Sequence, residues 1–170
     1  MTEKNIVLVG FMGSGKSVVA RSLADRTGAE LVAIDALIEA RTGKSIGAIF
    51  KEHGEGHFRD LETEVIREVS LRRGLIIDCG GGTVLRKENL QNLKANGIVF
   101  YLEASPEVIY ERIKNEKHRP LLKVPDPLGC IKEMYQQRLP LYKQADYTID
   151  ANDASIEGPV GEILQKTRTA

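Results

Sequence analysis

The sequence predicts a single α/β domain built on a parallel β-sheet that has helices on both faces. Five short apolar runs recur along the chain, at 6–9, 31–34, 75–77, 98–102 and 147–149, and segments with helical spacing separate them. The runs are continuous rather than alternating, which is typical of strands buried on both faces. The chain has 170 residues, which fits one domain. Ligands of such sheets bind beyond the carboxyl ends of the strands, so the residues that follow each strand are the candidates for chemistry.

The first strand leads into a glycine-rich stretch, Gly10-Phe11-Met12-Gly13-Ser14-Gly15-Lys16-Ser17. It matches the P-loop template G-x-x-x-x-G-K-[ST] in the strand–loop–helix context that the template requires. Its backbone N–H groups and the following helix N-terminus suit phosphate, Lys16 can reach the β- and γ-phosphates, and the Ser17 hydroxyl can ligate Mg²⁺. Because motif and context agree, an incidental turn is disfavoured. The predicted nucleotide-binding residues are Gly13, Ser14, Gly15, Lys16, Ser17 and Val18.

The helices carry recognisable start and stop signals. The first is expected over 16–27, and a short helix after the second strand ends near Thr42. Ser45 is expected to cap the next helix. A turn at 54–56 then precedes a further helix that starts near His57.

Two strand ends and one helix face supply further candidate residues. Asp35 follows the second strand, where it either caps the next helix or contacts a ligand. Gly80, Gly81 and Gly82 follow the third strand, which indicates either a close approach of backbone to a ligand or a flexible turn. Arg59 and Glu62, three residues apart on a helix, can pair.

A basic, proline-rich segment lies between two later helices. Ser105-Pro106-Glu107 is a strong helix start, and that helix carries Arg112. Residues 114–127 follow, and the next helix carries Arg138. The segment is either a lid that closes over phosphates or a plain solvated loop.

Composition argues against several classes of partner. Lys plus Arg and Asp plus Glu both number 24, so the chain lacks the net positive charge that would favour binding to nucleic acid. Cys79 and Cys130 have neither metal-ligand spacing nor an expected disulfide, and the three histidines are expected at the surface. No apolar stretch has the length of a membrane span and no signal peptide is recognisable. We therefore expect a cytoplasmic protein with no nucleic-acid or membrane partner. A monomer that binds small molecules is our working expectation, although the sequence does not fix the oligomeric state.

These motifs together resemble the shikimate kinase family over nearly the whole chain. The matching pieces are the P-loop at 10–17, Asp35 with Ile38-Glu39, Phe58-Arg59 with Glu62, Gly80-Gly81-Gly82, Arg119-Pro120-Leu121-Leu122, and Arg138 with Pro140-Leu141-Tyr142. The P-loop alone identifies only a large superfamily, whereas the five further pieces in this order are far more specific.

The resemblance implies a nucleoside-monophosphate-kinase-like fold with a five-stranded parallel sheet in the order 2-3-1-4-5. It implies transfer of the ATP γ-phosphoryl group to the 3-hydroxyl of shikimate with Mg²⁺, a step toward chorismate and the aromatic amino acids. One domain is expected, with a core, a substrate-binding segment at about 35–63 and a lid at about 114–127.

The residue chemistry agrees with that implication. Phosphoryl transfer needs alignment and charge stabilisation, for which Lys16 and Arg119 are the expected cations. Asp35 would hold the acceptor hydroxyl and take its proton. Arg59 and Arg138 would clamp the substrate carboxylate through paired hydrogen bonds. The resemblance also places Arg112 against adenine, Glu62 behind Arg59, and the backbone of residues 80–82 against the substrate.

One position departs from the family pattern. The family usually has Asp-x-Asp at the end of the second strand, and this chain has Ala33-Ile34-Asp35. Asp78 closes the next strand, where relatives carry a small or hydroxyl residue. Our hypothesis is that Asp78 takes over the outer-sphere Mg²⁺ role beside Ser17.

Two other functions remain open from the sequence. One is a different small-molecule kinase of this fold, such as one acting on gluconate. The other is a catalytically weak nucleotide-binding relative, which Ala33 suggests. A GTPase-type switch is disfavoured because the chain has no Asn-Lys-x-Asp signature.

Overall fold

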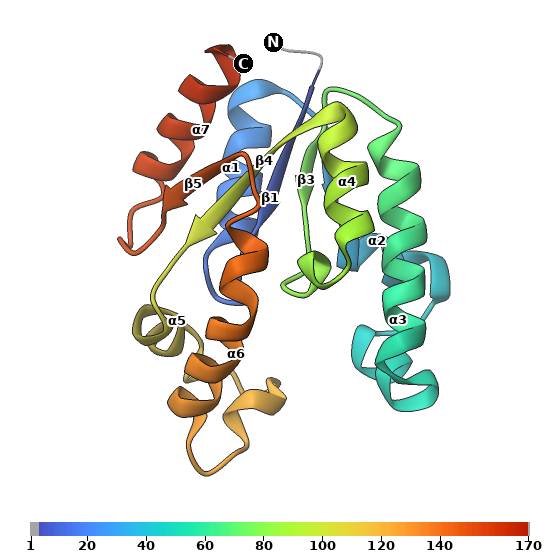
Figure 1. The fold of residues 1–170 in the computed structure, drawn as a ribbon, viewed down its shortest axis with the longest axis vertical. Helices are drawn as coiled ribbons and strands as arrows, with labels where there is room; N and C mark the ends of the chain where they lie inside the picture. Colours follow the sequence, from blue (N-terminus) through green and yellow to red (C-terminus); the bar gives the residue numbers. More distant parts are fainter. Residues whose placement is uncertain (1–3, 170) are drawn as a thin grey trace.

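A computed structural model describes residues 4–169, and its central sheet is the predicted one. Five parallel strands lie in the order β2-β3-β1-β4-β5, which confirms the order that the resemblance implied (Figure 1). The strands are β1 Asn5–Val9, β2 Leu31–Ala33, β3 Ile76–Asp78, β4 Gly97–Glu103 and β5 Tyr147–Asp150.

Helices cover both faces of this sheet. They are α1 Lys16–Thr27, α2 Ile34–Thr42, α3 Ile46–Ser70, α4 Lys87–Asn96, α5 Pro106–Ile113, α6 Pro127–Tyr142 and α7 Glu157–Thr169, with short 3₁₀ turns at Thr83–Leu85 and Pro120–Leu122. Figure 1 shows α1 and α7 on one face and α3, α4 and α6 on the other. No helix within residues 4–169 is long and apolar enough to cross a membrane.

The side chains of β1 show why its sequence is continuously apolar. Val7 and Val9 belong to one core cluster, which includes residues of α3, α4, α5 and α6. Ile6 and Leu8 belong to the other, which includes residues of α1 and α7. Successive side chains of a strand point to opposite faces, so a strand covered on both sides needs apolar residues at every position.

The helix starts predicted at Ser45 and Ser105 are confirmed. The Ser45 side chain accepts a hydrogen bond from Ala48 N at 3.2 Å, and the Ser105 side chain accepts one from Val108 N at 3.3 Å. Each satisfies a backbone N–H that the helix itself leaves unpaired. The surface placement of the histidines and the absence of a disulfide, both within the described part of the chain, also agree with expectation.

The structure differs from expectation at two boundaries. The expected turn at 54–56 is one kinked residue inside α3, because only Gly54 leaves helical geometry, with φ 82° and ψ 170°. Glycine adopts that positive φ without steric cost. Strand β2 ends at Ala33, so Asp35 lies in the first turn of α2. Ala33 occupies the N-cap position of α2 and its side chain makes no capping hydrogen bond. Asp35 is therefore not the N-cap.

Candidate active site

A cavity of about 540 Å³ lies beyond the carboxyl ends of β1, β2 and β3, where the parallel sheet predicted it. It brings together residues from the P-loop after β1, from the ends of β2 and β3, and from the 114–127 segment. The predicted site residues that line it are Gly13, Gly15, Lys16, Ser17, Val18, Asp35, Asp78, Gly80, Gly81 and Arg119.

Lys16 lines this cavity and is held by the P-loop backbone. It is buried, and its Nζ donates to Gly10 O at 2.8 Å and to Phe11 O at 3.0 Å. Burial lowers the pKa of the ammonium, while Asp78 and Asp35 act in the opposite direction. The charge therefore lies inside the P-loop and close to two carboxylates.

Asp35 has an unusual pKa for a carboxylate that water can reach. Its side chain is exposed to solvent, but protein surrounds it at the cavity wall. This desolvation, together with the charges of Glu62 and Asp78, raises the pKa of Asp35 to about 6. Carboxyl groups with a pKa close to the working pH are suited to proton transfer.

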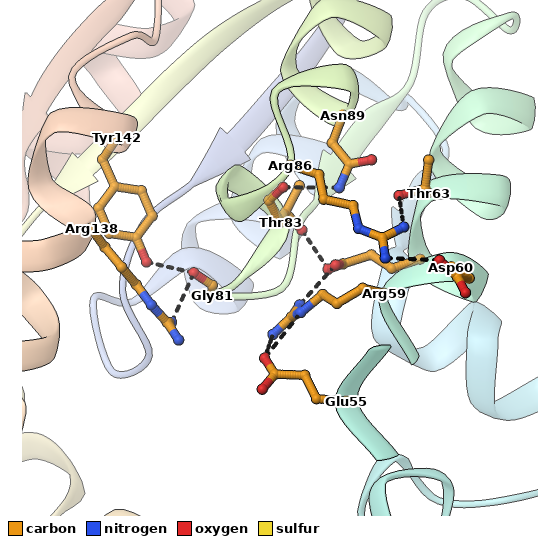
Figure 2. A network of polar contacts seen from close by, with 11 residues as sticks. Glu55, Arg59, Asp60, Thr63, Gly81, Thr83, Arg86, Asn89, Arg138 and Tyr142 are labelled. Atoms are coloured by element: carbon orange, nitrogen blue, oxygen red, sulfur yellow. Dashed lines mark hydrogen bonds and ion pairs between the residues drawn. The ribbon is translucent and has the colours of Figure 1, made fainter. Parts of the chain in front are cut away.

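Arg59 is fixed by an ion-pair network on α3 (Figure 2). Its Nη1 donates to Glu62 Oε2 at 2.8 Å, which confirms the pairing expected from the sequence. The fully buried Glu62 also accepts a bond from Thr83 Oγ1 at 2.7 Å. Glu55 accepts bonds from the Nε and Nη2 of Arg59 at 3.3 and 3.1 Å. The guanidinium is thus held from two sides.

The glycines at 80–82 allow side chains of the site to approach the backbone of this loop closely. A Cβ on Gly82 would lie 2.2 Å from Arg59 Nη2, and a Cβ on Gly80 would lie 2.8 Å from Asp35 Oδ1. The sequence predicted a close approach of this backbone to a ligand. At these two positions protein side chains occupy the space.

Arg138 reaches the same loop from the other side. Figure 2 shows Arg138 and Arg59 approaching the Gly81 loop from opposite sides, Arg138 from α6 and Arg59 from α3. Arg138 Nη1 donates to Gly81 O at 3.3 Å, and the Tyr142 hydroxyl donates to the same oxygen at 2.5 Å. The two arginines flank the loop that forms one wall of the cavity.

Asp78 and Ser17 are in direct contact. Ser17 Oγ donates to Asp78 Oδ2 at 2.6 Å. Asp78 is also the register partner of Ala33 on the neighbouring strand β2. Side chains at paired positions of adjacent strands lie on the same face of a sheet. The carboxylate missing at position 33 is therefore matched by one on the neighbouring strand.

Arg119 lines the cavity from the 114–127 segment. Its Nε donates to Glu116 Oε2 at 2.5 Å, and both residues line the cavity. Guanidinium and carboxylate are partly exposed, at 33% and 46%, so the pair is of the weak surface type. A phosphate group can compete for such an arginine.

Arg112 lies beside a second cavity of about 210 Å³, which shares Gly15 and Val18 with the first and is also lined by Ser14. Its Nη2 donates to Ala151 O at 2.7 Å and to Asp153 O at 2.9 Å. Its Nη1 donates to Gly13 O at 3.4 Å, so the arginine bridges the loop after β5 and the P-loop. The second cavity continues the first along the P-loop.

The sequence did not single out three contacts of this site. Glu55 precedes Arg59 by four residues on α3, but the turn expected at 54–56 concealed this helical spacing. The Thr83–Glu62 and Tyr142–Gly81 bonds join elements far apart in the chain, and no sequence spacing indicates them.

Comparisons with known proteins identify the family of this chain. The family model described as shikimate kinase matches residues 12–168. The chain belongs to the shikimate kinase family. A shikimate kinase of Thermodesulfovibrio yellowstonii is 44% identical over 163 residues, which are 96% of this chain and 94% of that protein. One of Burkholderia lata is 42% identical over 167 residues, which are 98% of this chain and 91% of that protein.

Solved structures give the same result for the fold. The shikimate kinase of Acinetobacter baumannii in complex with shikimate has a TM-score of 0.92 and 39% identity, covering 99% of this chain and 94% of that one. A gluconokinase from Sinorhizobium meliloti has a TM-score of 0.62 at 17% identity, so it shares the fold alone. Family membership makes the chain an ATP-dependent kinase, as the sequence predicted.

Proposed function

We propose that this chain transfers the γ-phosphoryl group of ATP to the 3-hydroxyl of shikimate. One observation carries the proposal: a single cavity joins the P-loop lysine to Asp35, and its Gly80–Gly81 wall is flanked by Arg59 and Arg138. Such a site suits a triphosphate on one side and a small hydroxy acid on the other.

The part of the site next to the P-loop would position the nucleotide and supply positive charge. The P-loop backbone and helix α1 face the phosphates, with Gly13, Ser14, Gly15 and Val18 along them. Lys16 and Arg119 supply positive charge to the transferring group. Arg112 lies beside the second cavity, which is mostly lined by small and apolar residues and fits the base.

The part of the site next to the glycine loop would orient the 3-hydroxyl of the acceptor substrate. Arg59 and Arg138 bind the substrate carboxylate through paired hydrogen bonds, and the backbone of Gly80, Gly81 and Gly82 lies against the ring. The Asp35 carboxylate accepts the proton of the 3-hydroxyl as that oxygen bonds to the γ-phosphorus. The bond from the γ-phosphorus to the β,γ-bridging oxygen breaks, and ADP leaves.

The oxygen groups of Ser17 and Asp78 fit Mg²⁺, which prefers hard oxygen ligands and keeps several waters. Ser17 would ligate the ion directly and Asp78 would hold one of its waters. The ion supplies neutralisation of charge on the β- and γ-phosphate oxygens. Residues 35–63 would act as the substrate-binding segment and 114–127 as the lid of one kinase domain.

A coupled assay of ADP release tests the function. ADP should appear with ATP, Mg²⁺ and shikimate, and only at background level when shikimate is omitted or replaced by gluconate. Release with gluconate but not shikimate would indicate another small-molecule kinase. ATP binding without release under any condition would indicate a catalytically weak relative.

The pKa of Asp35 predicts the acid limb of the pH profile. Because the base must be ionised, kcat/KM for shikimate should fall as the pH drops through about 6. ¹³C NMR of the carboxyl groups in the nucleotide-free chain should show one resonance titrating near that pH, and Asp35→Asn should remove it. A resonance of Asp35 that titrates near pH 4 would contradict the assignment.

Asp78→Asn is predicted to raise the Mg²⁺ concentration for half-maximal turnover several-fold, because a neutral amide holds a metal-bound water less firmly than a carboxylate does. A Mg²⁺ titration of turnover at fixed ATP measures this. The matched variant is Ala33→Asp combined with Asp78→Ser, which moves the carboxylate to the paired strand position and should restore the original dependence. An unchanged titration in Asp78→Asn would remove the hypothesis.

A further inference from the structure

The three glycine carbonyls after β3 are satisfied in different ways. Gly80 O accepts a bond from Thr83 N at 3.1 Å, and Gly82 O accepts one from Leu85 N at 3.0 Å. Gly81 O instead accepts from two side chains, Arg138 and Tyr142. The direction of the Gly81 carbonyl therefore depends on side chains of α6 and not on hydrogen bonds within the loop.

The Tyr142 hydroxyl is the better fixed of these two donors. The side chain is fully buried, and its ring stacks on Tyr101 with centroids 5.0 Å apart and an interplanar angle of 8°. Tyr101 in turn shares a 3.0 Å hydroxyl bond with Tyr135. Burial raises the pKa of Tyr142 to about 12, so the hydroxyl remains a donor throughout the working pH range.

Arg138 is the donor that can leave. Its side chain is only half-buried, and its bond to Gly81 O is long, at 3.3 Å against 2.5 Å for Tyr142. When its guanidinium turns to a substrate carboxylate, Tyr142 is the donor to Gly81 O that remains among residues 4–169. Gly81 is partly buried, and a carbonyl shielded from water that loses its donors offsets part of the gain from the new contact.

We propose that Tyr142 is a positioning residue for the acceptor substrate: it holds Gly81 O and so leaves Arg138 available to the substrate carboxylate. This rests on the function proposed above. Without the hydroxyl, Arg138 is the remaining donor to Gly81 O, and the substrate must compete with that carbonyl for the guanidinium. Tyr142 is not among the described residues that line the cavity, so it would act through Arg138.

Tyr142→Phe tests the proposal, because it removes one oxygen and keeps the stacked ring. The KM for shikimate should rise roughly tenfold, the size expected for one hydrogen bond that is partly shielded from water. The KM for ATP should stay within about twofold, because Gly81 is on the acceptor side of the cavity. Steady-state kinetics with each substrate varied in turn give both values.

Tyr135→Phe is the matched control. It also removes a buried tyrosine hydroxyl from the same aromatic cluster, but that hydroxyl bonds Tyr101 and not the glycine loop. Both KM values should stay within about twofold of the parent chain. Equal rises of the shikimate KM in the two variants would mean that Tyr142 only stabilises the fold, and would overturn the proposal.

A double-mutant cycle with Arg138→Gln further separates an effect of Tyr142 through Arg138 from an effect on fold stability. Because Tyr142 acts through Arg138, Tyr142→Phe should change kcat/KM for shikimate less than about twofold in the Arg138→Gln background. A further tenfold loss there would overturn the proposal. A parent chain that releases no ADP with shikimate would instead refute the proposed function, so the two failures are distinguishable.

Discussion

Asp35→Asn is expected to lower kcat roughly a thousandfold, the usual contribution of a positioned general base. Asparagine has nearly the shape of aspartate but cannot take the proton of the acceptor hydroxyl. Binding of ATP should survive, because the P-loop contacts do not involve position 35. The coupled assay gives kcat, and calorimetry gives the Kd for ATP.

The fold should tolerate this change. The folded-state pKa of Asp35 is raised to about 6 from an ordinary value of 3.8, so the fold favours the protonated form. Stability is therefore lost as the pH rises through about 6, and a residue that cannot ionise avoids that loss. The Tm of Asp35→Asn at pH 8 should equal or exceed that of the parent chain.

The control for charge is Asp25→Asn on the exposed face of α1, which should change neither kcat nor ATP binding. If Asp35→Asn keeps more than about a tenth of the parent turnover, another group takes the proton and the proposed base is wrong.

Gly82→Ala should reduce kcat/KM for shikimate by about a hundredfold or more, a change of at least about 2.7 kcal/mol. The new methyl group would lie 2.2 Å from Arg59 Nη2 and 2.5 Å from Cζ, so the guanidinium must move. That movement breaks its bonds to Glu62 and Glu55. The KM for ATP should stay within about twofold, because the displaced group is on the acceptor side.

Gly161→Ala is the matched control. It adds the same methyl group in helix α7, where nothing lies within 4 Å of the new atom. Because alanine favours a helix over glycine, this variant should be fully active and slightly more stable. Normal shikimate kinetics in Gly82→Ala would show that Arg59 does not need its present position to bind substrate.

The sequence determined the features that depend on neighbours along the chain. The P-loop, the strands buried on both faces, the caps at Ser45 and Ser105 and the Arg59–Glu62 pair all follow from local spacing, and the structure contains them. The placement of Lys16 and Asp35 at one cavity also followed, because parallel strands end at the same edge of a sheet.

Only the tertiary structure decided which groups touch across that edge. The Ser17–Asp78 bond joins residues 61 positions apart, and the Tyr142–Gly81 bond joins another pair 61 apart. The need for glycine at position 82 comes from Arg59 on a different element. The pKa of Asp35 likewise depends on carboxylates from α3 and β3. Hydrogen bonds and desolvation act over a few ångströms, so they depend on how elements pack, and spacing along the sequence carries no record of that packing.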